Sequence, residues 1–164
     1  MNYELFLSKL DERLCKYFEL HSKYIHCGLG CSLCCEKGDY PLSSIELEYL
    51  MRGFLSLNNE IKRKVQLNIK NMVKGEACPF LIDKTCSVYP YRPIICRVHG
   101  LAYLCKENMV KVPYCVNEDK NYKSVYQNGE IFIQPIAENL DTSALLKDYV
   151  IKDLADWLTN TENT

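Results

Sequence analysis

The stretch Cys27-Gly28-Leu29-Gly30-Cys31-Ser32-Leu33-Cys34-Cys35 concentrates four cysteines in nine residues. Thiolate is a soft, strong ligand for zinc and for iron–sulfur clusters. Ligands three or four positions apart can converge on one centre, whether the backbone is helical or forms a tight loop. The glycines in the spacers let the backbone turn sharply. The spacing therefore predicts that this segment contributes ligands to a metal centre.

The adjacent pair Cys34-Cys35 limits how such a centre is built. Neighbouring side chains diverge on a strand and are about 100° apart on a helix. Two adjacent cysteines therefore rarely suit one small tetrahedral ion. They fit better if they serve two centres, or if one of them is a bystander.

A second group of cysteines follows in a segment rich in Pro and Tyr. It reads Cys78-Pro79-Phe80-Leu81, Cys86-Ser87-Val88-Tyr89 and Arg92-Pro93-Ile94-Ile95-Cys96-Arg97. With a trailing cysteine, the two segments supply eight candidate metal ligands: Cys27, Cys31, Cys34, Cys35, Cys78, Cys86, Cys96 and Cys115. Eight thiolates suffice for two four-thiolate centres. One centre with spare cysteines, or a polynuclear cluster with bridging sulfur, would use the same residues.

Two arginines, Arg92 and Arg97, flank Cys96. Guanidinium groups beside a metal–thiolate centre can donate hydrogen bonds to the bound sulfur and offset its negative charge. We therefore expect both arginines to support the centre without binding the metal.

The charge balance and the hydropathy of the chain bear on the compartment in which we expect this protein. The 20 basic and 21 acidic residues nearly cancel, so no global field favours nucleic acid or an anionic membrane as a partner. No apolar run approaches the roughly 20 residues that span a bilayer, and the N-terminus lacks the order of a secretory signal. We expect a cytoplasmic protein, in which ten cysteines indicate metal binding and not disulfides.

Apolar residues recur at helical spacing in four stretches. The stripe of the first stretch consists of Tyr3, Phe6, Leu7, Leu10, Leu14, Tyr17 and Phe18. The second opens at Ser43, whose Ser-x-x-Glu pattern with Glu46 has the form of a capping box, and runs toward Leu57. These patterns predict one helix at the N-terminus and another after Ser43.

The third and fourth helices are predicted from their caps. Asn58 or Asn59 can cap the third helix, and Gly75 is a suitable stop for it. Asp141 or Thr142 can cap the fourth, whose apolar positions are Leu145, Leu146, Tyr149, Val150, Leu154 and Trp157.

The fold class follows from these elements. Short strands are expected at 110–113 and 131–133. The length suits one domain with a real hydrophobic core. We predict a mainly α fold, in which residues 1–164 form a single small helical domain with minor short strands. Its irregular, cysteine-rich core at 26–116 is organised around a metal–thiolate cluster.

Taken together, the two cysteine segments resemble a known family. The pattern Cys27-x3-Cys31-x2-Cys34-Cys35, with Cys78-Pro79-Phe80-Leu81 and Cys86-x2-Tyr89-x2-Arg92-Pro93-x2-Cys96-Arg97, resembles the CxxCxxCC zinc- or iron-chelating proteins, the YkgJ-like cysteine-cluster family. The resemblance covers roughly 26–116 and implies a cysteine cluster that holds zinc or an iron–sulfur centre. Seven cysteines match the pattern, and Cys115 matches a looser trailing position. The first spacer is one residue longer than in the motif, and Cys105 could replace Cys115 as the last ligand.

The remaining candidate side chains have simpler interpretations. Cys15 lies among core positions of the first helix, and we expect it to be structural. Because cysteine is in excess, ligation by His21 or His26 is not needed. His99 could donate a hydrogen bond near the centre or cap a helix. Glu46 is expected to cap its helix, and Glu48 to lie on a solvated face.

Three functions remain open from the sequence. The first is a cytoplasmic protein that holds an iron–sulfur cluster or Zn2+, in one or two centres, for electron transfer or redox sensing. The second is a structural zinc protein that presents a surface to a protein partner. The third is a cluster-dependent enzyme. The chain has no phosphate-cradling glycine loop, no His-Glu-x-x-His and no nucleophile elbow, so the balance favours a role that is not enzymatic.

Overall fold

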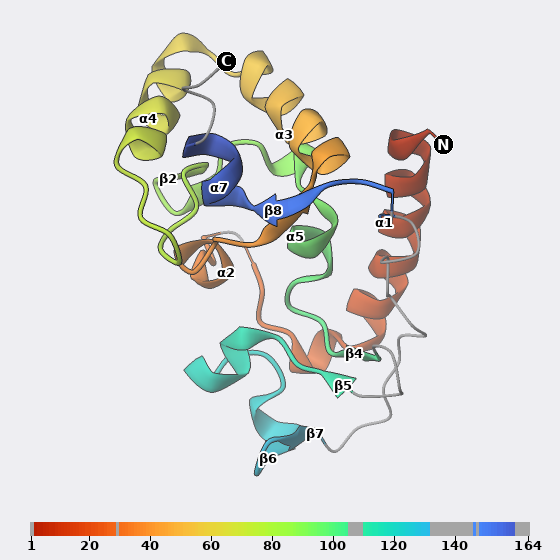
Figure 1. Ribbon diagram of the computed structural model, residues 1–164. Helices are drawn as coiled ribbons and strands as arrows, with labels where there is room; N and C mark the ends of the chain where they lie inside the picture. The colour runs from red at the N-terminus through yellow and green to blue at the C-terminus, as the bar shows by residue number, and fades with distance from the viewer. Residues whose placement is uncertain (1, 29, 105–109, 132–145, 147, 160–164) are drawn as a thin grey trace. The chain divides into compact units, whose positions relative to one another are not determined.

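The computed structural model describes residues 2–28, 30–104, 110–131, 146 and 148–159 (Figure 1). The chain divides into two compact units, each made of two separate stretches of sequence. Unit 1 comprises Met1–Gly28 and Arg97–Lys147, and unit 2 comprises Leu29–Cys96 and Asp148–Thr164. Helices dominate the described residues and the strands are two or three residues long, which confirms the mainly α fold class. The single-domain organisation stays a prediction.

Unit 1 opens with the long helix α1, Tyr3–Leu20, drawn in red in Figure 1. Its N-cap is Asn2, whose side-chain oxygen accepts a hydrogen bond from the backbone N–H of Leu5 at 3.1 Å. The buried positions are Tyr3, Leu7, Leu10 and Leu14, which belong to the predicted apolar stripe. Cys15 is exposed, so its expected place among the core positions of the helix is wrong, whereas its expected lack of a metal-binding role stays a prediction.

The second part of unit 1 consists of short turns and hairpins. The 3-10 helices are η1 (Ser22–Tyr24), η4 (Tyr114–Glu118) and η5 (Lys123–Val125). The strands pair as β4 (Tyr103–Leu104) with β5 (Val110–Lys111) and β6 (Tyr126–Gln127) with β7 (Glu130–Ile131). These pairs confirm a strand at the predicted Val110 start and at Ile131, whereas residues 132–133 lie outside the described part. Ala102, Val116 and Tyr122 form a small buried core.

Unit 2 contains the two other predicted helices with their predicted caps. Helix α3, Ser44–Ser56, starts with the complete capping box of Ser43 and Glu46. Helix α4, Asn59–Lys70, is capped by the side chain of Asn58. It ends at Lys70, with Asn71 as its C-cap, and so earlier than the expected Gly75. A short helix, α2 (Leu33–Glu36), lies inside the first cysteine segment.

The predicted fourth helix is wrong over residues 151–153. These residues form strand β8, Ile151–Asp153, which pairs antiparallel with β1, Pro41–Ser43. Residues 148–150, which the prediction also placed in this helix, are not helical either, whereas α7, Leu154–Thr159, is helical. Residues 141–145 and 147 lie outside the described part. A strand forms because a partner far away in sequence supplies backbone hydrogen bonds that local apolar spacing does not reveal.

The core of unit 2 joins α3, α4 and α7 to the second cysteine segment. Its buried residues are Leu42, Leu50, Phe54, Val65, Phe80, Val88 and Leu154. The remaining elements are β2 (Leu81–Ile82), β3 (Thr85–Cys86), η2 (Tyr89–Tyr91) and α5 (Ile94–Val98). Because Phe80 and Val88 flank Cys86 in sequence and are buried, this core fixes the backbone on either side of that cysteine. Among the described helices, none combines the length and apolar character needed to cross a bilayer.

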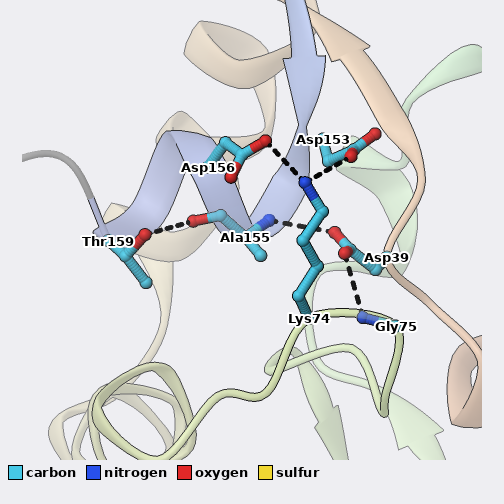
Figure 2. A network of polar contacts seen from close by, with 7 residues as sticks. All are labelled: Asp39, Lys74, Gly75, Asp153, Ala155, Asp156 and Thr159. Atoms are coloured by element: carbon cyan, nitrogen blue, oxygen red, sulfur yellow. Dashed lines mark hydrogen bonds and ion pairs between the residues drawn. The ribbon is translucent and has the colours of Figure 1, made fainter.

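A polar network ties the C-terminal segment of unit 2 to the loop before Cys78 (Figure 2). The carboxylate of Asp39 accepts hydrogen bonds from the backbone N–H of Gly75 at 3.0 Å and of Ala155 at 3.1 Å. Beside it, Lys74 contacts the carboxylates of Asp153 at 2.8 Å and Asp156 at 2.9 Å. Asp39 therefore joins three segments of the chain through its two oxygens.

We expect Asp39→Ala to lower the free energy of unfolding by about 1–3 kcal/mol, because the buried Ala155 N–H loses a charged acceptor. Urea denaturation followed by circular dichroism measures the change. The matched control is Asp156→Asn, which removes one of two carboxylates around the exposed Lys74 and should cost less. Equal losses in the two variants would contradict this role for Asp39.

Candidate metal centre

Two backbone hydrogen bonds join the first cysteine segment to the second. The N–H of Cys78 donates to the carbonyl of Cys35 at 2.7 Å, and the N–H of Gly38 donates to the carbonyl of Glu76 at 3.1 Å. Gly38 is buried where the two segments meet. A Cβ on Gly38 would lie 2.5 Å from the Cβ of Cys78 and 2.8 Å from the Cys35 carbonyl, far closer than van der Waals contact. Only glycine allows this approach without displacing one of the segments.

The first segment presents Cys34 and Cys35 from the single turn of α2. The Ser32 hydroxyl donates to the carboxylate of Glu36 at 2.6 Å across this turn. The Tyr40 hydroxyl donates to the carbonyl of Cys34 at 2.8 Å and satisfies a carbonyl at the end of so short a helix. These contacts hold the turn that carries the two adjacent cysteines.

A tight hairpin accounts for the spacing between Cys78 and Cys86 in the second cysteine segment. Strands β2 and β3 pair Leu81 with Cys86, and the two-residue turn between them is Asp83-Lys84. Both turn residues have positive φ, 49° and 60°, as expected for the type I′ geometry of such hairpins. The hairpin returns Cys86 toward Cys78, whose carbonyl accepts from the N–H of Leu81 at 3.0 Å.

Helix α5 supplies Cys96, and a buried carboxylate anchors its start. The Glu46 carboxylate accepts from the backbone N–H of Ile94 at 3.0 Å, in addition to closing the capping box with Ser43. Glu46 is only 3% exposed. The predicted helix cap therefore has a second role, because it attaches the cysteine-bearing helix to α3. Glu48 is exposed and pairs with Arg52 at 2.6 Å, which confirms the predicted solvated face.

The thiols of unit 2 influence one another electrostatically. A hydrogen bond from the Cys35 thiol lowers the pKa of Cys34 to about 7, and the same bond raises the pKa of Cys35. Burial raises the pKa of Cys78 to about 12, and burial also raises the pKa of Cys86 and Cys96. The charge of Cys34 contributes to the raised pKa of each of those three thiols. Five cysteines from two distant segments of the sequence thus share one electrostatic environment.

Comparison with known protein families shows to which family this chain belongs. Residues 26–123, more than half of the chain, match the family described as "CxxCxxCC: Putative zinc- or iron-chelating domain". The chain belongs to the CxxCxxCC family. The match confirms the family that the cysteine pattern resembles, and its description agrees with the metal binding predicted from the cysteines. Searches of curated proteins and of solved structures gave no match.

The donor atoms of this CxxCxxCC protein fit zinc or an iron–sulfur centre in chemistry, because both bind thiolate. The described residues contain no group of three or more His, Cys, Asp or Glu side chains arranged to hold a metal ion. Cys34 and Cys35 share a side-chain hydrogen bond, and the prediction that they serve two centres or include a bystander stays a prediction. The backbone hydrogen bonds bring the two cysteine segments together, and the arrangement of their thiols around a metal stays a prediction.

The structure distributes the eight predicted ligands between the two units. Cys34, Cys35, Cys78, Cys86 and Cys96 share the environment described above. Cys31 also belongs to unit 2, where it is exposed before α2. Cys27 and Cys115 belong to unit 1, and their charges both act on the Tyr122 hydroxyl. Cys105 lies outside the described residues, so the choice between it and Cys115 stays a prediction, as does the ligand set as a whole.

The two arginines beside Cys96 differ in their contacts. The Arg92 guanidinium stacks on the Tyr89 ring at 3.6 Å and donates to the carbonyl of Cys96 at 3.3 Å. Its positive charge opposes the rise in the pKa of Cys86 and Cys96. Arg97 is buried and forms an ion pair with Asp11 of α1. The supporting role at bound sulfur stays a prediction for both side chains, and the geometry favours Arg92.

The histidines occupy positions in unit 1. His21 is buried, and its Nδ1 lies 2.9 Å from the Tyr122 hydroxyl. His26 is exposed, and its backbone N–H donates to Asn121 at 2.8 Å. Burial lowers the pKa of His99, which follows the end of α5 at Val98.

Sequence reasoning missed Gly38, Tyr40 and Asn121, which contact cysteines of this CxxCxxCC protein. Gly38 packs on Cys78, Tyr40 binds the carbonyl of Cys34, and Asn121 donates to the sulfur of Cys27 at 3.1 Å. None of them belongs to a cysteine spacing or a helical period. Gly38 and Tyr40 follow the first cysteine segment closely in the sequence, and this was the only sign that they could contact it. Asn121 gave no such sign, because it lies 94 residues from Cys27.

Proposed function

We propose that this chain is a cytoplasmic metalloprotein whose cysteines hold an iron–sulfur cluster or zinc. The observation that carries the proposal is the direct contact between the two cysteine segments, in which the N–H of Cys78 binds the carbonyl of Cys35. Segments 43 residues apart in sequence thus come together at residues that both carry thiols. The family description, a zinc- or iron-chelating domain, supports the same function.

The ligands proposed for unit 2 are Cys34, Cys35, Cys78, Cys86 and Cys96, with Cys31 available from the exposed turn before α2. Bound metal would stabilise the thiolate forms, which burial disfavours in the metal-free protein. Arg92 would offset the remaining negative charge. An iron–sulfur centre would supply one-electron chemistry for electron transfer or redox sensing, and zinc would supply structural stability.

The metal identity is the first prediction that this proposal makes. Protein purified without oxygen is expected to contain either iron and inorganic sulfide, with a visible charge-transfer band, or stoichiometric zinc without colour. Elemental analysis and an absorption spectrum of the same sample distinguish the two results. Protein that is folded by circular dichroism and contains neither metal would overturn the proposed function.

A further inference from the structure

The sulfur of Cys27 lies against a buried amide in unit 1. The side-chain Nδ2 of Asn121 donates to the Cys27 sulfur at 3.1 Å and to the carbonyl of Gly100 at 2.8 Å. The Oδ1 of the same side chain accepts from the backbone N–H of His26 at 2.8 Å. Asn121 is 1% exposed, so these three contacts satisfy the donors and the acceptor of an amide that water does not reach.

The partners determine which way this amide points. A backbone N–H can only donate, so the group facing His26 must be the oxygen. A carbonyl can only accept, so the group facing Gly100 must be the nitrogen. The second hydrogen of that nitrogen is then directed at the sulfur of Cys27. The sulfur is therefore the acceptor in this contact, and the same N–H can donate to the sulfur when it is bound to metal.

Gly100 completes the surroundings of the sulfur. Its φ is +99°, a conformation that favours glycine. A Cβ at this position would lie 2.9 Å from the Cys27 sulfur and 3.2 Å from the Asn121 nitrogen. Any larger residue would push the sulfur away from the amide, so two independent features of Gly100 preserve this contact.

The backbone that presents Asn121 is strained. Tyr122, the next residue, has φ +62°, which is unusual for a bulky side chain and costs of order 1–3 kcal/mol. Several contacts hold this conformation. Tyr122 is fully buried, its N–H donates to the carbonyl of Tyr24 at 2.8 Å, and its hydroxyl accepts from the N–H of Ala102 at 3.0 Å. Strain of this kind persists where the surrounding structure over-determines it, and here these contacts fix the backbone directly after Asn121.

We propose that Asn121 is a positioning residue for Cys27, holding the Cys27 sulfur as a hydrogen-bond acceptor and donating to it when metal is bound. The donation to metal-bound sulfur rests on the proposed function, whereas the contact with the Cys27 sulfur does not. A donor on metal-bound sulfur withdraws electron density from it, and such contacts tune metal–thiolate centres. Asn121 thus acts on Cys27, one of the cysteines that match the family pattern, and itself lies within the matched residues 26–123.

The test compares Asn121→Leu with Lys123→Ala in the full chain. Asn121→Leu removes the donor to the Cys27 sulfur, whereas Lys123→Ala removes only an exposed ion pair with Asp119 at 3.2 Å, two residues further along the chain. With cobalt(II) as the probe metal, we expect the sulfur-to-metal charge-transfer band to shift in Asn121→Leu and to stay at the wild-type position in Lys123→Ala. An unchanged band in Asn121→Leu would overturn the role in the metal-loaded protein.

A second measurement needs no metal and leaves the buried amide intact. Cys27→Ala removes an exposed thiol, and we expect the NMR signal of the Asn121 side-chain amide to shift in the metal-free variant relative to metal-free wild type. No shift would overturn the contact itself. If wild type takes up no metal, the proposed function fails and the metal-binding part of this inference fails with it. The amide signal then still decides whether Asn121 holds the Cys27 sulfur.

Discussion

Cys86→Ser is expected to abolish stoichiometric metal binding and to lower the melting temperature by more than about 10 °C. Cys86 is half-buried on β3, in the hairpin that returns the chain toward Cys78. Serine keeps the size of the side chain but lacks the soft sulfur that zinc and iron–sulfur clusters prefer. The direct consequence is one missing ligand in the centre of unit 2.

The magnitude follows from the small stability of whole domains. Structural zinc contributes an apparent ~10–16 kcal/mol in small zinc-finger peptides, whereas a domain is stable by only about 5–15 kcal/mol. Each kcal/mol lost lowers the melting temperature by roughly 2–4 °C in a domain of 150–250 residues. Losing about a third of the metal contribution is therefore enough to produce the expected shift.

Cys15→Ser is the matched control for Cys86→Ser. Cys15 is exposed on α1, so its replacement removes a thiol without creating a cavity or a missing ligand. Metal content by elemental analysis and melting by circular dichroism are expected to match those of wild type. If Cys15→Ser were as damaging as Cys86→Ser, our assignment of the ligands would be wrong.

Gly38→Ala is expected to lower both metal content and stability, although it changes no ligand. The added methyl group would lie 2.5 Å from the Cβ of Cys78 and 2.8 Å from the carbonyl of Cys35, so the two segments must separate. Overpacking of this kind typically costs about 1–3 kcal/mol. The separation would also break the Cys78 to Cys35 hydrogen bond on which the proposed function depends.

Gly28→Ala is the control for this second experiment. Gly28 also lies beside cysteines in the sequence, but nothing lies within 4 Å of the position that its Cβ would take. Its metal content and midpoint of urea denaturation should equal those of wild type. A Gly38→Ala protein with wild-type metal content and stability would show that the segments do not approach as closely as described.

Local patterns were sufficient for much of the fold. The apolar stripe and the caps at Ser43 and Asn58 predicted α1, α3 and α4, because a helix satisfies its own backbone and shows its buried face at a fixed period. The same reasoning failed at residues 151–153, where pairing with Pro41–Ser43 overrides local spacing. It also failed at Cys15, because an apolar period does not determine which flank of a helix becomes covered.

For the candidate metal centre too, one part could be predicted from the sequence and another part could not. Metal affinity depends on residue type and number, so the cysteines alone identified the chemistry and the family. Their convergence is a matter of contacts between distant segments. The contacts of Gly38 with Cys78 and of Asn121 with Cys27 form only when the chain folds, so the spacing of cysteines in the sequence does not predict them.

The sequence by itself determined that thiols able to bind metal are present in excess and that the fold class is mainly α. The first property depends on residue type alone, and the second on the spacing of apolar residues over a few positions. Only the tertiary structure decided which thiols share an environment, which glycine lets them meet and which amide faces the Cys27 sulfur. The physical reason is that steric exclusion and hydrogen bonding act over a few ångströms of space, regardless of separation along the chain.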